Sequence, residues 1–332
     1  MTAHDVLPAN RLVVVIIGRN EGERLRSCLQ SVAAGPMPVV YVDSGSCDGS
    51  SAMAQSLGAV TVDLDMSQAF TAARARNEGV RQIQEVAPQC DYVQFVDGDC
   101  EVATGWLSQA SAFLASNADI AAVFGRRRER YPDRSIYNRL CDIEWDTPLG
   151  EIRACGGDVM MRIDAFKQVG GFRGDLIAGE EPELCVRLRA QGWRIWRLDA
   201  EMTLHDAAIT RFGQWWTRTV RAGYAFANGA HLHGAPPERH WVREARSAWA
   251  WGLCLPLAII VAAFMFGPWA LAALGVYPTQ VLRLLLRSRG TLETRFLRAS
   301  FLVLGKFPEA FGALKFQVRI WSGGAARLIE YK

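Results

Sequence analysis

Two aspartates separated by one glycine, Asp97 and Asp99, are the residues of this sequence best suited to metal chemistry. They follow an alternating apolar run from Tyr92 to Val96, which predicts a buried strand that ends at the carboxylates. Two carboxylates this close repel each other in a low-dielectric site, and a divalent cation removes that cost. Because oxygen ligands suit Mg²⁺ and Mn²⁺, the pair predicts a site for one of these ions with a diphosphate. The alternative interpretation is an Asp-Gly turn at the surface.

Strands alternate with helices in the N-terminal part of the chain. Apolar spacing predicts strands at 12–17, 38–42, 60–64 and 92–96, with helices at 25–32, 50–57 and 70–83 between them. This alternation is typical of an α/β fold with a mostly parallel sheet and helices on both faces. Ligands of such sheets bind at the carboxyl ends of the strands. We therefore expect one site to be lined by the polar residues at those ends, which are Asn20, Asp43, Asp48, Asp97 and Asp99.

The next stretch of the chain supplies groups that move protons or bind ions. Glu180 and Glu181 open a predicted helix, where acids either stabilise the N-terminus or include a general base. His205 belongs to a strand predicted to end at 204–206, separate from another predicted at 193–198. We expect His205 to lie beside Asp97 and Asp99, which makes it a candidate ligand for the metal or for a phosphate.

Arginine carries nearly all of the positive charge, since only four of the 37 Lys and Arg residues are lysines. Arginine suits bidentate recognition of phosphate. Arg126 to Arg130 follow a strand predicted at 120–124. This run predicts either a solvated basic loop or a contact with an anionic substrate or a membrane surface.

Composition and missing motifs exclude several classes of protein. The net charge of the 332 residues is only +3, which does not indicate a general nucleic-acid binder. The eight cysteines form no Cys-x-x-Cys pair and no zinc spacing, so we expect buried thiols in a reducing compartment. Neither a glycine-rich dinucleotide motif after the first strand nor a P-loop is present.

Taken in order, these motifs resemble the family 2 inverting glycosyltransferases, which have the GT-A fold. The resemblance covers residues 11–228 and rests on Gly18-Arg19-Asn20-Glu21, Val42 to Ser50, Ala73-Arg74-Ala75-Arg76-Asn77, Asp97-Gly98-Asp99, Gly156-Gly157-Asp158, Gly179-Glu180-Glu181 and His205-Asp206. It implies a GT-A nucleotide-sugar-binding domain whose metal, Mn²⁺ or Mg²⁺, lies on the donor diphosphate.

The resemblance also implies residue roles. Asp43 is expected to contact the nucleotide base and ribose, with Asp48 as a lesser candidate. Asp97 and Asp99 are expected to bind the metal, for which His205 is a further ligand candidate. The family's Glu-Asp pair supplies the catalytic base, and Glu180 and Glu181 stand at its position, so either can serve; we favour Glu181. The donor-binding set implied in this way is Asn20, Glu21, Asp43, Asp48, Arg76, Asp97, Gly157 and Asp158.

The composition changes after residue 228. No charged residue occurs between Arg246 and Arg283, and Gly267-Pro268 lies near the middle of that stretch. Residues 248–286 therefore predict a hydrophobic helical hairpin, whose flanking arginines place both ends in the cytoplasm. The alternatives are a re-entrant pair and a buried hairpin of a soluble protein. Residues 291–332 predict an amphipathic segment on the membrane surface, so we divide the chain into a catalytic domain at 1–228 and a membrane-associated region at 229–332.

Polysaccharide-processing relatives carry a Gln-x-x-Arg-Trp motif, which residues 214–219 do not match. Arg218, on a predicted helix, is a candidate contact for donor or acceptor phosphates, although a solvated helix face explains it almost as well. We predict transfer of one sugar from a UDP- or GDP-sugar to a lipid-linked saccharide, at the cytoplasmic face of the bacterial inner membrane. The product would serve exopolysaccharide or another surface glycan. The alternatives are a transferase acting on polyprenyl phosphate and a non-catalytic membrane scaffold.

Overall fold

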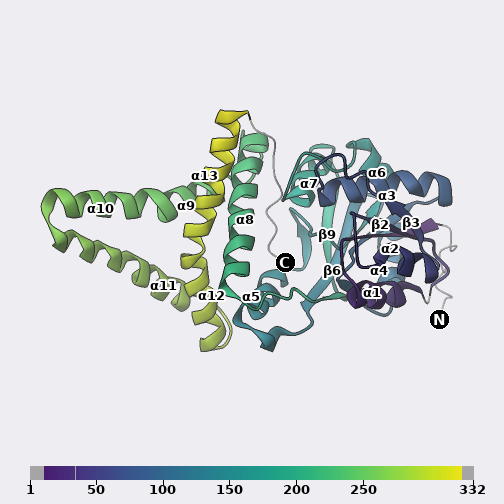
Figure 1. Cartoon of the computed structure of the whole chain (residues 1–332), viewed down its shortest axis with the longest axis horizontal. Helices are drawn as coiled ribbons and strands as arrows, with labels where there is room; N and C mark the ends of the chain where they lie inside the picture. The colour runs from purple at the N-terminus through teal and green to yellow at the C-terminus, as the bar shows by residue number, and fades with distance from the viewer. Residues whose placement is uncertain (1–10, 34, 324–332) are drawn as a thin grey trace. The chain divides into compact units, whose positions relative to one another are not determined.

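The computed structural model describes residues 11–33 and 35–323. The chain folds as two compact units (Figure 1). The first comprises the residues up to Pro132 together with Cys141–Ala208, and the second comprises Asp133–Leu140 together with the residues from Ile209 onward. All described strands belong to the first unit. The change of composition at residue 228 falls inside a helix of the second unit, and this helix packs on helices that follow it in the chain.

The first unit is built on a mixed sheet of nine strands in the order β3-β2-β1-β4-β8-β6-β9-β5, with β7 beside β9. The strands are β1 (Leu12–Gly18), β2 (Val39–Asp43), β3 (Val60–Asp63), β4 (Tyr92–Asp97), β5 (Cys100–Val102), β6 (Ile120–Glu129), β7 (Gly150–Ile152), β8 (Val159–Arg162) and β9 (Arg194–His205). The first four strands pair in parallel, as the sequence predicts, and so do β6 and β9. The strands β5, β7 and β8 pair antiparallel, so the sheet is less parallel than expected. Periodicity locates a strand but does not give its direction.

Helices flank this sheet. They are α1 (Glu23–Ala33), α2 (Ser50–Ser56), α3 (Ala72–Val86), α4 (Trp106–Ser116), α6 (Ile163–Gln168) and α7 (Glu180–Ala190). The short helix η2 (Pro132–Arg134) and the helix α5 (Ile136–Trp145) are each divided between the two units. The hydroxyl of Thr71 caps α3 by accepting the Arg74 N–H. Gly79 lets α3 approach β1, because a Cβ there would collide with Val15. Arg76 lies one turn before Gly79 and is therefore carried on the buried side of α3.

Two predictions about strands are wrong. Arg126–Glu129 extend β6 and do not form a loop. Likewise, β9 is one strand of 12 residues rather than two short ones. Both strands are irregular where they pair, with register shifts on either side of Arg126. Such bulges re-aim neighbouring side chains, which is why the charged residues do not alternate as a simple strand would require.

The second unit is helical in its described part. Its helices are α8 (Phe212–His233), α9 (Val242–Trp249), the π-helical turn η3 (Ala250–Cys254), α10 (Leu255–Phe266), the 3₁₀ helix η4 (Pro268–Gly275), α11 (Val276–Arg287), α12 (Leu292–Leu304) and α13 (Lys306–Ser322). The segments Val242–Phe266 and Pro268–Arg287 are each long and apolar enough to cross a membrane. They form the hairpin that projects from the other helices of this unit (Figure 1).

The predicted amphipathic tail is a pair of helices in its described part, and residues 324–332 lie outside that part. The helix α13 packs one face closely on α8 through glycines, since a Cβ on Gly312 or Gly223 would collide with the backbone of the facing helix. Other side chains of α13 are exposed, among them Phe311, Val318 and Trp321, and an amphipathic segment on a membrane surface remains a prediction.

Candidate active site

The loops after β1 and β2 are tied together by their polar side chains. Asn20, whose φ of 55° is left-handed, accepts the Cys47 N–H with its side-chain oxygen and donates its own N–H to Ser46 Oγ. Asp48 accepts the Gly22 N–H at 3.1 Å. Asp48 and Asn20 therefore shape the edge of the sheet at which the resemblance places the donor.

Asp43 ends β2 and is almost fully buried. Its carboxylate accepts the N–H groups of Gly45 and Ser46 and the hydroxyl of Tyr41. Burial, followed by the charge of Asp43, raises the pKa of Tyr41, which keeps the phenol protonated. These contacts fix the turn after β2, and a contact of Asp43 with a nucleotide stays a prediction. Glu21, in the neighbouring loop, forms an ion pair with Arg24 at 2.7 Å.

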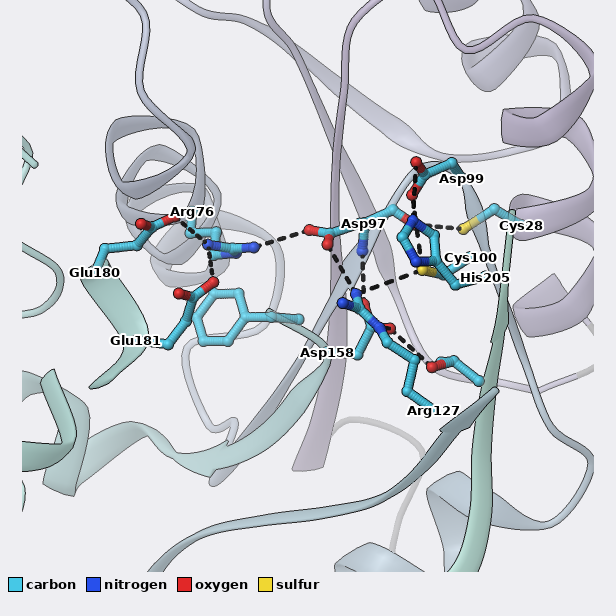
Figure 2. A network of polar contacts seen from close by, with 12 residues as sticks. Cys28, Arg76, Asp97, Asp99, Cys100, Arg127, Asp158, Glu180, Glu181 and His205 are labelled. Carbon is cyan, nitrogen blue, oxygen red and sulfur yellow. Dashed lines mark hydrogen bonds and ion pairs between the residues drawn. The ribbon is translucent and has the colours of Figure 1, made fainter. Parts of the chain in front are cut away.

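Arg76 joins the predicted metal side of the site to the predicted base (Figure 2). Its buried guanidinium lies 2.8 Å from Asp97 Oδ1, 3.1 Å from Glu180 Oε1 and 2.9 Å from Glu181 Oε1. The carbon of the guanidinium lies 5.6 Å from the centre of the Phe172 ring. One cation thus holds three carboxylates from β4 and from the start of α7.

Arg127 is a site residue that sequence reasoning missed. It stands on β6 and forms ion pairs of 2.9 Å with both Asp97 and Asp158 (Figure 2). Asp158 also accepts the Asp97 N–H and the Thr203 hydroxyl. Although burial raises the pKa of Asp97, Arg76 and Arg127 outweigh that effect and hold the pKa below its ordinary value. Within a run of arginines, no sequence signal distinguishes Arg127 from its neighbours.

We expect Arg127→Met to destabilise the protein much more than Arg128→Met. The first change leaves the fully buried Asp158 without its cation, which costs about 3–5 kcal/mol. The second breaks only the half-exposed ion pair with Glu201, worth less than about 1 kcal/mol. Thermal unfolding of the full chain in detergent should therefore show a decrease of about 10 °C for Arg127→Met and little change for its neighbour. Equal decreases would contradict the assigned role.

Asp99 and His205 form the part of the site best suited to a metal. Asp99 Oδ2 lies 3.2 Å from His205 Nε2, across the pairing of β5 with β9. His205 Nδ1 is buried and has no hydrogen-bond partner in the described part of the chain. Cys100 lies near both side chains, but burial raises the pKa of its thiol well above the ordinary value and leaves it a weak ligand. The donor set that remains is one carboxylate and one imidazole.

The structure thus divides the three predicted metal ligands. It brings Asp99 and His205 together, whereas the two oxygens of Asp97 each face an arginine. Cys100 has ligand atoms of Asp99 and His205 within 4.8 Å of its thiol, and those of Asp97 and Asp158 within the same distance. Asp97, which pairs with Arg76, therefore lies between Arg76 and the predicted metal ligands.

Glu181 is a carboxyl group of the site with a strongly perturbed pKa. Burial, followed by the adjacent charge of Glu180, raises its pKa to about 7, and Arg76 opposes this effect. The helix that carries both acids begins after Gly179, whose φ of 81° is left-handed. A carboxyl group with a pKa near 7 is well matched to proton transfer at neutral pH.

Gly157 lies where several of these side chains meet. A Cβ at this position would collide with Nη2 of Arg76 and would lie 3.0 Å from Asp97 Oδ2 and 3.1 Å from Glu181 Oε1. The neighbouring Gly156 has open space around it. A larger residue at position 157 would therefore displace the guanidinium of Arg76, and the involvement of Gly157 in the site remains a prediction.

We expect Gly157→Ala to lower the sugar-transfer rate at least about a hundredfold, because displacement of Arg76 by an ångström misplaces all three carboxylates. Gly156→Ala is the matched control and should leave the rate within about twofold of the wild type. Initial rates of both variants, with circular dichroism to confirm folding, provide the test. A fully active Gly157→Ala protein would show that the network is not needed.

Arg218 is the one predicted site residue outside the first unit. It lies on α8 of the second unit, and its contact with a phosphate stays a prediction.

A further residue that sequence reasoning did not select is Trp145, at the end of α5. Its ring centre lies 4.8 Å from that of His205 and 5.3 Å from the guanidinium carbon of Arg127. An aromatic residue in a polar helix gives no sequence signal of such a contact.

Comparisons with known proteins give three results. Residues 13–169 match the family model described as glycosyl transferase family 2. The "Succinoglycan biosynthesis protein ExoA" of Rhizobium meliloti (strain 1021) is 24% identical over 286 residues, which cover 82% of this chain and 86% of that protein. The solved structure of the mannosyltransferase PcManGT from Pyrobaculum calidifontis, in complex with GDP-Man and Mn²⁺, has a TM-score of 0.64 and 18% sequence identity. That match covers 96% of this chain and 91% of the other, and it confirms the predicted fold.

Proposed function

We propose that this chain is a family 2 glycosyltransferase that moves one sugar from a nucleotide-diphosphate sugar to a lipid-linked saccharide, with inversion, in bacterial exopolysaccharide synthesis. The observation that carries the proposal is the single polar network of the first unit. At one end Asp99 and His205 present metal ligands, and at the other Glu181 presents a base. Asp97 and Arg76 lie between those two ends.

The donor set of Asp99 and His205 fits a divalent ion, because a carboxylate oxygen and the imidazole Nε2 face each other at 3.2 Å. An imidazole favours a transition metal such as Mn²⁺ over Mg²⁺, which prefers oxygen ligands alone. The similar mannosyltransferase was solved with Mn²⁺. When bound, the ion would neutralise the charge that develops on the leaving diphosphate.

Glu181 would take the proton of the acceptor hydroxyl as that oxygen attacks the anomeric carbon. Arg76 and the start of α7 hold its carboxylate in place. Inversion needs only this one base and one displacement. Burial raises the pKa of Cys28 and Cys100, so these nearby thiols are poor nucleophiles, in keeping with a mechanism that forms no covalent intermediate.

The hydrophobic hairpin supports a lipid-linked acceptor. Three of its most exposed side chains, Phe264, Met265 and Trp269, lie around the turn between α10 and η4. A hairpin of this kind is stabilised by lipid. With arginines at both of its ends, it would anchor the enzyme to the cytoplasmic face of the inner membrane.

The test is a transfer assay with the purified full chain, a panel of UDP- and GDP-sugars, and Mn²⁺ or EDTA. We expect metal-dependent release of nucleoside diphosphate with one donor, and a glycolipid product with a lipid-linked saccharide. A product formed on bare polyprenyl phosphate would instead identify that lipid as the acceptor. Absence of turnover with every donor and both acceptors would contradict the proposed activity and favour a scaffold.

A further inference from the structure

We propose that Tyr224 and Arg319, both in the helical second unit, bind the phosphate of a phospholipid head group. This site is separate from the network described above. The proposal rests on the membrane association proposed for the hairpin, but it does not depend on the transfer reaction.

Tyr224 and Arg319 come from two helices that lie side by side, α8 and α13 (Figure 1). The helices run in the same direction, because Gly223 of α8 faces Glu309 of α13, and His231, further along α8, contacts Phe316, further along α13. The ring of Phe316 meets the Tyr224 ring edge-on, with 5.4 Å between the ring centres. Tyr224 is therefore held firmly at the interface of the two helices.

Arg319 extends back over these two rings. Its guanidinium carbon lies 5.7 Å from the centre of the Tyr224 ring and 5.3 Å from that of Phe316. This direction is the normal one for a helical side chain, which leans toward the N-terminus of its helix. The guanidinium is thereby placed beside the ring that carries the phenolic hydroxyl.

Both donors lack an acceptor. The hydroxyl of Tyr224, a residue only 4% exposed, and Nε of Arg319 are buried and have no hydrogen-bond partner within the described residues. A buried donor left unsatisfied costs about 1–3 kcal/mol. No ion pair to Arg319 exists in the described part of the chain, so its charge is not neutralised there. A phosphate group supplies both a negative charge and several acceptor oxygens.

The surroundings favour a lipid as the source of the phosphate. The exposed face of α13 carries Phe311, Val318 and Trp321, with Lys315 beside the first of these. Apolar and aromatic side chains mixed with basic ones are typical of helices at the membrane interface. The base of the hairpin also packs on the start of α13, because Gly252 fits closely against Lys306. We therefore place α13 at the depth of the head groups.

The experiment measures binding of dioctanoyl phosphatidylglycerol to the full chain in detergent by isothermal titration calorimetry. Tyr224→Phe removes one donor without changing the charge, and we expect it to weaken binding about tenfold. Arg319→Gln should weaken binding still more. Lys315→Gln is the matched control, since it removes one positive charge from the same helix without touching the pair, and should cost at most about fivefold.

Three outcomes would overturn the proposal. Binding that Tyr224→Phe leaves unchanged would show that the hydroxyl takes no part, and equal losses for Arg319→Gln and Lys315→Gln would indicate general charge attraction. Inorganic phosphate that binds as tightly as the lipid would show a free-anion site. Donor turnover in the same detergent should stay at the wild-type level in all three variants, which distinguishes failure of this site from failure of the transferase.

Discussion

Replacing Asp99 with asparagine should lower the rate of donor turnover about a thousandfold and weaken Mn²⁺ binding in parallel. Asp99 supplies the only carboxylate within hydrogen-bonding distance of His205 Nε2 in the described structure, and an amide cannot neutralise a divalent ion. Loss of an electrostatic group that acts on the leaving oxygens typically costs 10²–10³ in rate or more. Calorimetry of Mn²⁺ binding and release of nucleoside diphosphate are the two measurements.

Glu101→Gln is the control for Asp99→Asn. Glu101 lies two residues after Asp99, on β5, and pairs with Arg130. Its substitution removes the same charge from a position close in the sequence and should leave the turnover rate within about threefold of the wild type. If Asp99→Asn kept more than a tenth of the wild-type rate, the metal would have to lie elsewhere.

The second large effect is expected for Glu181→Gln. The variant should lose about 10²–10⁴ in the rate of transfer to the acceptor while binding the donor normally, because glutamine cannot accept the proton of the hydroxyl. Glu180→Gln decides between the two acids. Glu180 shares Arg76 with its neighbour but is more deeply buried, with a side chain 5% exposed against 13%. We expect its substitution to cost about tenfold, and the opposite order would make Glu180 the base.

The rate should also depend on pH. A base acts in its deprotonated form, so kcat/KM of the wild type should rise with pH up to about 7 and level off above it. The raised pKa also means that the folded protein holds this proton more tightly than the unfolded chain. The contribution of Glu181 to stability therefore falls as the pH rises from its ordinary pKa to about 7. A rate that is flat between pH 5 and 8 would contradict the assignment to the acid pair.

Much of the site follows from the sequence because polar residues end apolar strands. The strand before Asp97 and the helix begun by Glu180 and Glu181 occur where the pattern places them. The roles of Asp97 and Asp99 were harder to predict. Residues two apart in one strand share a face of the sheet. Here, however, the strand ends at Asp97, and Gly98 begins a turn, so Asp99 precedes a new strand. Asp99 faces His205, whereas Asp97 faces two arginines.

Arg127 illustrates why the rest could not be predicted. Four of the five residues at 126–130 are arginines, and their periodicity gives no reason to bury one arginine and expose the next. The difference is made by β-bulges and by acids that lie 30 positions before and 31 positions after Arg127 in the sequence. Long-range ion pairs of this kind leave no local pattern. The contact between Trp145 and His205 is also made by residues far apart in the sequence, so no local pattern predicts it.

The way in which the chain is shared between its two units limits how the protein can be dissected. Asp133–Leu140 lie between the two segments of the first unit in the sequence, yet they belong to the helical unit. There Ser135 donates to the Ile209 carbonyl, Asn138 accepts the Ile209 N–H, and the Tyr137 ring packs on Trp215. A chain ended at residue 208 would keep residues 133–140 and lose Ile209 and Trp215, which they contact. A soluble transferase therefore requires retention of α8 or redesign of residues 133–140, and simple removal of the C-terminal third should yield an aggregating protein.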